Sequence, residues 1–264
     1  MVDTMKSRTP TLKAIPSLED QVAPAEWQAR VDLAALYRLV ALRGWDDMIY
    51  THISARIPGT DGEFLINPYG LFFEEITASS LVRIDHDGCI LQDTNYPVNR
   101  AGFMIHSAIH AAREDAHFVM HLHTDTGIAV ACQKQGLMPL SQHALMVLPH
   151  LAYHGYEGIA LHEAERDRLA ADLGGKTLML LRNHGTLAVG DTAANCWSGM
   201  HYLERACAVQ IQALSAGHAE VLIAPAESQE EVRRQVTGRN LIGGRHSWAA
   251  CLRKLDRALP GYDK

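Results

Sequence analysis

The stretch Ala116-His117-Phe118-Val119-Met120-His121-Leu122-His123-Thr124 predicts a buried β-strand that runs into a pair of histidines. Side chains two residues apart on a strand point to the same face of the sheet. His121 and His123 are therefore aimed together, as two ligands of one metal ion must be.

A second apolar strand, Lys176–Leu181, leads to a third histidine, His184, in a turn that Gly185 closes. Three imidazoles leave open positions on a divalent metal ion, which is typical of a catalytic rather than a structural site. We expect one divalent metal ion per subunit, and three neutral imidazoles suit Zn²⁺, Fe²⁺ or Mn²⁺. The alternative is that the three side chains are buried, hydrogen-bonded core histidines.

The composition narrows the range of partners. The chain has 264 residues, of which 47% are hydrophobic and 20% are charged, an ordinary balance for a globular protein. A formal net charge of −6 argues against a basic surface that binds nucleic acid. No apolar run approaches the roughly 20 residues of a membrane helix. The five cysteines are scattered and no secretory signal is recognisable, so we expect reduced thiols and a cytoplasmic location.

Helical and strand-like periodicities alternate along the chain, which predicts one α/β domain with a mixed, largely antiparallel sheet covered by helices. We place an N-terminal arm at residues 1–24, the domain at 25–222, and a C-terminal tail at 223–264 that packs on the domain or on a neighbouring subunit. Helices are expected at residues 25–43, 100–113, 126–134, 162–173 and 193–216. Strands are expected at residues 48–56, 63–67, 81–85, 89–92, 116–120, 176–181 and 187–189.

Four motifs in this order resemble the class II aldolase/adducin family over roughly residues 33–213, and together they are specific although each alone is weak. They are Thr51–Arg56, Leu65–Gly70, His121–His123 and Asn183–Gly185. The phrase Val98–Phe103 is similar to the adducin-like bacterial branch of the family.

The resemblance implies a single α/β/α layered domain, with zinc held by His121, His123 and His184. It also implies a homotetramer whose active sites lie between subunits. In aldolases of the family the metal stabilises the ene-diolate that forms when a sugar phosphate is cleaved. A divalent cation suits that task because carbon–carbon cleavage beside a carbonyl puts negative charge on oxygen.

Several positions depart from the aldolase pattern. Gly102 stands where those enzymes have a glutamate that ligates the metal and moves protons, four residues before His106. Arg100 and Ala101 replace the two serines that hold phosphate, and His52 replaces a phosphate-loop asparagine. The metal cradle is therefore retained, while the phosphate-binding and acid–base groups are not.

Histidine and arginine side chains near the motifs are candidates for the missing roles. His143, which corresponds to an aldolase tyrosine, could act as the acid–base group, since histidine titrates near neutral pH. His52 could contact substrate, and the alternative for both is a histidine at a pocket edge or an interface. Arg100 could fork onto a substrate carboxylate, or it could form a surface or intersubunit salt bridge.

Two further pairs of residues have a predicted role. Asn67 and Gly70 are expected to shape the substrate loop, because glycine permits the backbone to approach a ligand closely. His106 and His110 are four residues apart and share a helix face. They could form a second metal site, but a structural role is the simpler interpretation.

These observations lead to three hypotheses. The first is a divalent-metal-dependent lyase that cleaves a carbon–carbon bond, by decarboxylation or retro-aldol cleavage, in a non-phosphorylated oxo- or hydroxy-acid. The second is a non-heme iron oxygenase that acts on a 2-keto acid, although its ligands differ from the usual two histidines and a carboxylate. The third is a non-catalytic, adducin-like binding module. In both enzymatic cases the partner is a small molecule, expected to be a carboxylate.

Overall fold

A seven-stranded mixed sheet forms the centre of the computed structural model, which describes residues 15–158, 163–217, 220–237 and 244–264. The strands follow the order β3-β2-β1-β4-β7-β6-β5, and every neighbouring pair is antiparallel except β5 with β6. Their bounds are β1 (His52–Arg56), β2 (Phe64–Ile66), β3 (Val82–Ile84), β4 (Phe118–Leu122), β5 (Leu151–His154), β6 (Leu178–Leu181) and β7 (Gly185–Gly190). The predicted α/β fold with a mixed, largely antiparallel sheet is confirmed.

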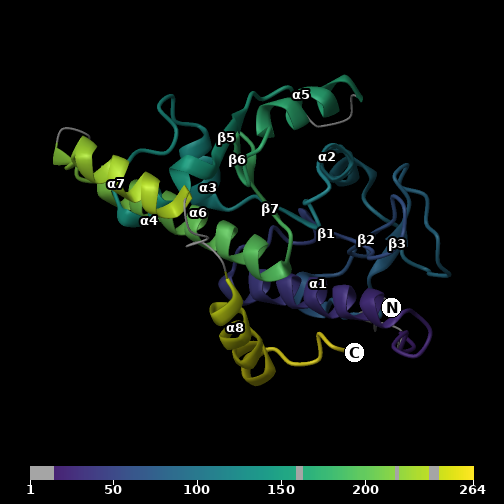
Figure 1. Cartoon of the computed structure of the whole chain (residues 1–264). Coiled ribbons are helices and arrows are strands. Elements are labelled where there is room, and N and C mark those ends of the chain that lie inside the picture. The colour runs from purple at the N-terminus through teal and green to yellow at the C-terminus, as the bar shows by residue number, and fades with distance from the viewer. Residues whose placement is uncertain (1–14, 159–162, 218–219, 238–243) are drawn as a thin grey trace, which may run out of the picture.

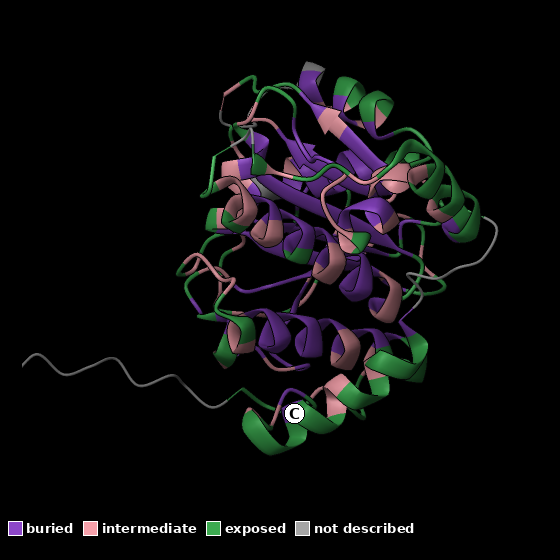
Figure 2. Cartoon of the chain, turned by 90° about the vertical axis from the view of Figure 1, so that its left-hand side faces the viewer, coloured by how far each residue is buried: buried purple, intermediate pink, exposed green. Residues whose placement is uncertain are grey.

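Helices cover both faces of this sheet and complete three layers (Figure 1). Helices α1, α3 and α6 contact strands on one face, and α2 and α5 pack on the other. The helices are α1 (Pro24–Arg43), α2 (Arg100–Ala112), α3 (Asp125–Ala131), α4 (Gln142–Val147), α5 (Glu163–Leu173), α6 (Ala193–Leu214), α7 (Ala226–Thr237) and α8 (Arg245–Ala258). Two short 3-10 helices span Phe73–Glu75 and Leu148–His150. Burial is greatest in the sheet and on the inward sides of the helices (Figure 2).

Strand β4 divides its side chains between two hydrophobic cores. Phe118, Met120 and Leu122 belong to the larger core, which includes α1 and α6, whereas Val119 belongs to a smaller core with residues of α2 and α5. Because alternate residues face opposite sides of a sheet, His121 shares the face of Val119 and lies on the α2 side.

Local signals explain where the long helices begin and end. Pro24 occupies the first turn of α1, where its missing N–H costs nothing, and Gly44 ends the helix in a left-handed conformation at φ +63°. Thr192 caps α6, because its hydroxyl oxygen accepts a hydrogen bond from the Asn195 N–H at 3.2 Å.

One of the predicted strands is shorter than expected, and another is absent. The strand expected at residues 48–56 begins only at His52, because Met48 and Thr51 have φ values of +55° and +66°, outside the β region. The segment 89–92 contributes one isolated bridge, Ile84 with Ile90, and no strand. There the side-chain oxygen of Gln92 accepts the Arg83 N–H at 3.0 Å, so a side chain replaces the next backbone partner.

The C-terminal tail lies against the domain within the same chain. Helix α8 contacts α1 and α6, and α7 contacts α4. The end of the chain is held by backbone bonds from Ala78 N–H to the Tyr262 carbonyl and from Ser79 N–H to the Lys264 carbonyl, both 2.8 Å. Of the predicted N-terminal arm, residues 1–14 lie outside the described residues.

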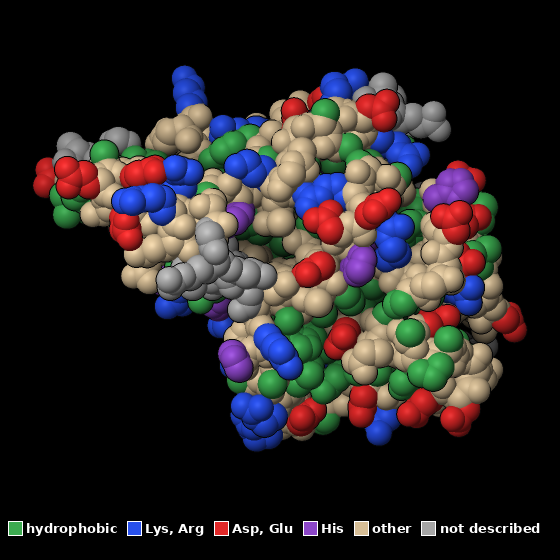
Figure 3. All heavy atoms as spheres, in the orientation of Figure 1, with side chains coloured by type: hydrophobic (Ala, Val, Ile, Leu, Met, Phe, Trp, Pro, Cys, Tyr) green, Lys and Arg blue, Asp and Glu red, His purple; other side chains and the backbone are tan. Residues whose placement is uncertain are grey.

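Charged side chains of both signs are mixed over the face seen in Figure 3, with no continuous basic patch among the residues described there. Within the described ranges, none of the helices combines the length and the apolar character that crossing a bilayer requires.

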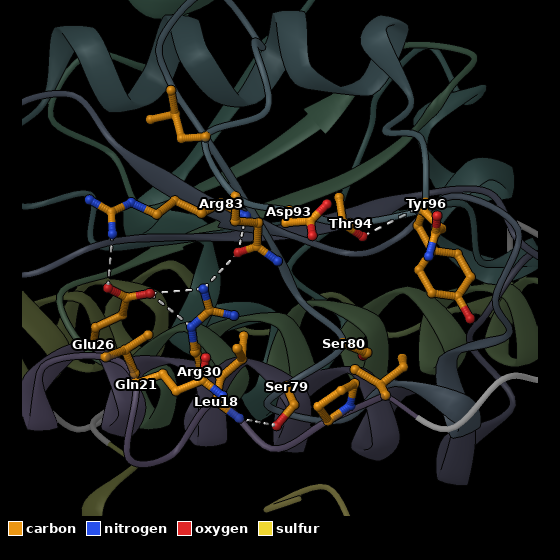
Figure 4. A pocket seen from close by; sticks show the side chains of 16 residues that line it. Leu18, Gln21, Glu26, Arg30, Ser79, Ser80, Arg83, Asp93, Thr94 and Tyr96 are labelled. Carbon is orange, nitrogen blue, oxygen red and sulfur yellow. Dashed lines mark hydrogen bonds and ion pairs between the residues drawn. The ribbon is translucent and has the colours of Figure 1, made fainter.

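A cavity of about 750 Å³ lies beside the start of α1, between residues 15–22 and 91–96 (Figure 4). Arg30, which is 1% exposed, is one of the residues that line the cavity. The five N–H groups of this guanidinium are all accepted, by Glu26 Oε1 twice, the carbonyls of Ala78 and Leu81, and the side-chain oxygen of Gln92. The cavity therefore offers a ligand no free donor from its buried cation.

We expect Glu26→Ala to lower the free energy of unfolding by about 3 kcal/mol, because it leaves the buried Arg30 charge without its carboxylate. Denaturant unfolding measures the change. Glu230→Ala is the matched control, since Glu230 pairs with Arg233 on the exposed surface, and its unfolding midpoint should not move. Equal midpoints for both variants would show that the buried pair contributes nothing to stability.

Candidate metal centre

The structure brings His121, His123 and His184 together, as their spacing predicts. One ring nitrogen from each of the three lies within 4.8 Å of the others. Nε2 of His121 is 3.0 Å from Nε2 of His123, and the ring centroids are 4.7 to 4.9 Å apart. His121 lies in β4, His123 follows the strand, and His184 occupies the turn between β6 and β7. Among the described residues no other group of three His, Cys, Asp or Glu side chains has such geometry.

Two backbone features place His184 against the other rings. Asn183 adopts a left-handed conformation at φ +56°, and the His184 N–H donates to the Leu181 carbonyl at 3.1 Å to close the turn. A Cβ on Gly185 would lie 2.4 Å from the Leu122 carbonyl oxygen and 3.2 Å from ring carbons of His121 and His123. Glycine is therefore required for β7 to approach β4 at this point.

Hydrogen bonds from Nδ1 of two rings determine which ring nitrogen is available to bind a metal ion. Nδ1 of His121 is 3.0 Å from the Thr186 carbonyl oxygen, and Nδ1 of His123 is 3.1 Å from Oδ2 of Asp47. A carbonyl or carboxylate oxygen only accepts, so each Nδ1 carries a hydrogen, and in the neutral form of each ring Nε2 is left with a lone pair. Two such lone pairs 3.0 Å apart repel each other, and a cation bound by both removes that repulsion. The donor set therefore fits a divalent metal ion.

Burial keeps His121 and His184 neutral. It lowers the pKa of His121 far below its ordinary value, and it lowers the pKa of His184 to about 4, with the neighbouring histidines adding to both shifts. Neutral imidazole is the form that binds a metal ion, so these two rings need lose no proton near pH 7.

A buried carboxylate holds the backbone next to the three histidines. Glu204, on α6 and 2% exposed, accepts hydrogen bonds from the hydroxyls of Thr186 at 2.6 Å and Thr124 at 2.5 Å. Burial raises the pKa of Glu204. Because the carbonyl of Thr186 also accepts from His121, Glu204 helps to fix the strand that orients that ring. The sequence patterns did not predict this buried carboxylate, although Glu204 is the one acidic residue in the sequence of α6.

His52 lies beside the cluster. It pairs directly with His121 across β1 and β4, and it is 7% exposed. Its Nε2 is 3.1 Å from the side-chain nitrogen of Asn99, and burial lowers its pKa to about 3. His52 is therefore a neutral, polar neighbour of the three histidines, and its contact with substrate stays a prediction.

His106 and His110 are joined by a serine rather than by a metal. The Ser54 hydroxyl oxygen is 2.6 Å from Nδ1 of His106 and 2.7 Å from Nε2 of His110. Nδ1 of His110 donates to the Ala116 carbonyl at 2.7 Å, so its Nε2 accepts from Ser54, and Ser54 accepts from His106. This directional chain ties α2 to β1 and supports the structural interpretation of the pair.

The other predicted site residues are placed as follows. Asn67 is 3% exposed, and its side-chain oxygen lies 2.9 Å from the Tyr37 hydroxyl, so it anchors the loop to α1. Gly70 has φ +106° and open space where a Cβ would be, so backbone conformation rather than crowding requires glycine there. Arg100 is the first residue of α2, and its side chain lies outside the described part of the chain.

His143 does not join the cluster within one chain. It lies in α4, half-buried, and its described ring contact is with Tyr202 of α6 at 5.7 Å between centroids. Residues that the sequence patterns missed do reach the cluster. They are Asp47, on His123, and Tyr156, 57% exposed and 6.5 Å from His184 between ring centroids.

Comparison with known proteins agrees with this fold and site. The sequence profile of the Class II Aldolase and Adducin N-terminal domain matches residues 31–211. This chain belongs to the class II aldolase and adducin family. A Caulobacter vibrioides protein, provisionally named an aldolase class 2 protein, is 66% identical over 247 residues, 93% of this chain and 96% of that one. Alpha-adducin of Rattus norvegicus is 44% identical over 198 residues, 74% of this chain but 27% of alpha-adducin.

Two solved structures superpose over nearly the whole chain. An aldolase II superfamily protein from Pseudomonas syringae has a TM-score of 0.89 and 51% identity, over 94% of this chain and 100% of that one. L-fuculose 1-phosphate aldolase from Glaciozyma antarctica has a TM-score of 0.77 and 26% identity, over 94% of each chain. This member of the class II aldolase and adducin family therefore has the layered fold that the resemblance implied.

Gly185→Ala should lower the free energy of unfolding by about 3 kcal/mol, because its Cβ has to displace the backbone of β4 beneath the histidines. Thermal and denaturant unfolding measure the change. Gly155→Ala is a control in open space and should leave the midpoint in place. A Gly185→Ala protein as stable as the control would contradict the close approach of β4 and β7.

The buried histidines also predict that acid destabilises the fold. The pKa of His110 is about 3 in the folded chain, through burial, against 6.5 for an ordinary histidine. Between these values only the unfolded chain binds the proton, so stability is complete above about pH 6.5 and falls as the pH drops towards 3. One such histidine contributes a slope of about 1.4 kcal/mol per pH unit.

His110→Gln should therefore reduce the pH dependence of unfolding between pH 4 and 6 by about that slope. Denaturant unfolding of metal-free protein at several pH values measures it. Phe64→Leu removes the ring stacked on His110 at 4.6 Å, so it should lower stability without changing the slope. An unchanged slope in His110→Gln would mean that this histidine is protonated in the folded chain.

Proposed function

We propose that this chain is a divalent-metal-dependent lyase that cleaves a carbon–carbon bond in a non-phosphorylated oxo- or hydroxy-acid, by decarboxylation or retro-aldol cleavage. The observation that carries the proposal is the cluster of His121, His123 and His184, with two bare Nε2 atoms 3.0 Å apart. Zn²⁺ is the metal that we favour, and Fe²⁺ or Mn²⁺ also suits the donor set. When bound, the metal would stabilise the negative charge that develops on a substrate oxygen.

The chain's own residues would prepare this site in two ways. The Thr186 carbonyl and the Asp47 carboxylate hold two rings in the tautomer that exposes Nε2. Burial keeps His121 and His184 neutral, so their ligand atoms are available near pH 7. These features support a preorganised metal site, which is the part of aldolase chemistry that the sequence retains.

The substrate is proposed to carry a carboxylate rather than a phosphate. Arg100 and Ala101 replace the serines that hold phosphate in the sugar-phosphate aldolases, and neutral His52 brings no charge to the site. Arg100, at the start of α2, would bind the carboxylate, while Asn67 and Gly70 would shape the loop over the substrate.

His143 is our candidate for the group that moves a proton. In one chain it packs on Tyr202, away from the three histidines. We therefore propose that it acts at the site of a neighbouring subunit, in the homotetramer that the family resemblance implies. Its half-buried position on α4 leaves the ring partly open to such a neighbour.

Metal content tests the proposal. Protein purified without a nickel column should contain close to one Zn, Fe or Mn per chain, and His121→Ala should contain almost none. Turnover on a panel of 2-oxo- and hydroxy-acids, followed as release of CO₂ or an aldehyde, should fall at least about 100-fold in His121→Ala. His117→Ala is the matched control, because this exposed histidine lies four residues before His121 and outside the cluster.

Two outcomes would favour another function. Protein that holds no metal and turns over no acid of the panel would favour a non-catalytic binding module, which the likeness to alpha-adducin supports. Iron in the protein, with turnover that stops when O₂ is removed, would favour the oxygenase. Full turnover by His121→Ala on an identified substrate would contradict the metal-dependent mechanism itself.

A further inference from the structure

Asp47 occupies a strained turn between α1 and β1. The Tyr50 N–H donates to the Asp47 carbonyl at 2.8 Å, which closes a four-residue turn. Inside that turn Met48 has φ +55°, and Thr51, directly after it, has φ +66°. Left-handed conformations are rare for non-glycine residues, particularly for β-branched threonine. The surrounding structure must therefore hold the turn in this shape, in which the Asp47 side chain meets His123.

The contact between Asp47 and His123 differs from those made by the other two rings. Oδ2 of Asp47 is 3.1 Å from Nδ1 of His123. His121 instead donates to an uncharged carbonyl, and His184 is placed by its backbone turn. Among the described ion pairs, this is the one that brings a carboxylate to the three histidines.

We propose that Asp47 is a positioning residue for His123. Its negative charge, which lies behind that ligand, takes the place of the charge of the glutamate that the aldolases have at the position of Gly102. This inference rests on the proposed metal-dependent function. A carboxylate that accepts the Nδ1 hydrogen fixes the ring and increases the electron density on Nε2, which strengthens its bond to a metal ion.

The two groups come from different parts of the chain. Gly102 lies one helical turn before His106 on α2, whereas Asp47 lies in the loop between α1 and β1. A residue without a side chain cannot ligate a metal from α2. The carboxylate of Asp47 remains half-exposed.

Asp46 provides a matched control. It is the adjacent residue with the same side chain, and its described interactions are with its own backbone and with the charges of Glu74 and Asp47. Removing its charge changes the local net charge as much as removing that of Asp47. It leaves the hydrogen bond to His123 in place.

The test compares Asp47→Asn, Asp47→Glu and Asp46→Asn in the full chain. Co²⁺ and Zn²⁺ affinities are measured by competition with a chelating dye, and the visible spectrum of the Co²⁺ protein is recorded. We expect Asp47→Asn to bind both metals 10- to 100-fold more weakly and to shift the Co²⁺ bands. Asp47→Glu should recover part of the affinity, and Asp46→Asn should stay within about twofold of the parent protein. The melting temperature of the metal-free proteins should be equal, since Asp47 is half-exposed.

The possible failures are distinguishable. If His121→Ala loses the metal while Asp47→Asn keeps both the parent affinity and the parent Co²⁺ spectrum, the role of Asp47 is wrong and the metal site stands. If Asp46→Asn weakens binding as much as Asp47→Asn, general charge rather than the contact with His123 is responsible, and the positioning role is also wrong. If the parent chain binds neither metal, the proposed function fails and this inference fails with it.

Discussion

The antiparallel pairing of β4 with β7 is the contact on which the site depends. It joins His121 to Leu187 and Leu122 to Thr186, strands that are more than 60 residues apart in the chain. The absence of a side chain at Gly185 lets the strands close at the point where the turn from β6 presents His184. His121 from β4, His123 directly after β4 and His184 from the turn between β6 and β7 then converge.

The same pairing explains why the three rings are held in different ways. His121 is inside the sheet, so a backbone carbonyl of β7 is its natural partner. His123 lies beyond the last paired residue, where no strand supplies a carbonyl, and a side chain from the α1–β1 loop takes that place. The strain at Met48 and Thr51 is consistent with a loop shaped for this contact rather than for its own backbone preference.

Sequence patterns predicted those parts of the structure that depend on near neighbours. Alternation along β4 identified the shared orientation of His121 and His123, and helical spacing with capping residues located α1 and α6. Distant contacts left no such pattern. Asp47 meets His123 across 76 residues, and Glu204 meets Thr124 across 80, so neither partner can be found from spacing. The strand expected at 89–92 fails for the same reason, since the Gln92 side chain takes the Arg83 N–H that alternation alone assigns to a backbone partner.

The charge of the site bears directly on which reactions it could support. With neutral imidazoles as the only ligands, a divalent ion would keep its full double charge, whereas a glutamate at position 102 would cancel half of it. The Asp47 carboxylate would be separated from the ion by an imidazole ring, so it would offset less of that charge than a direct ligand. Such a centre would attract an anion able to contact it directly. An oxo- or hydroxy-acid of the proposed kind would bring its own carboxylate to that position, where the carboxylate could serve as the leaving group or orient the bond to be broken.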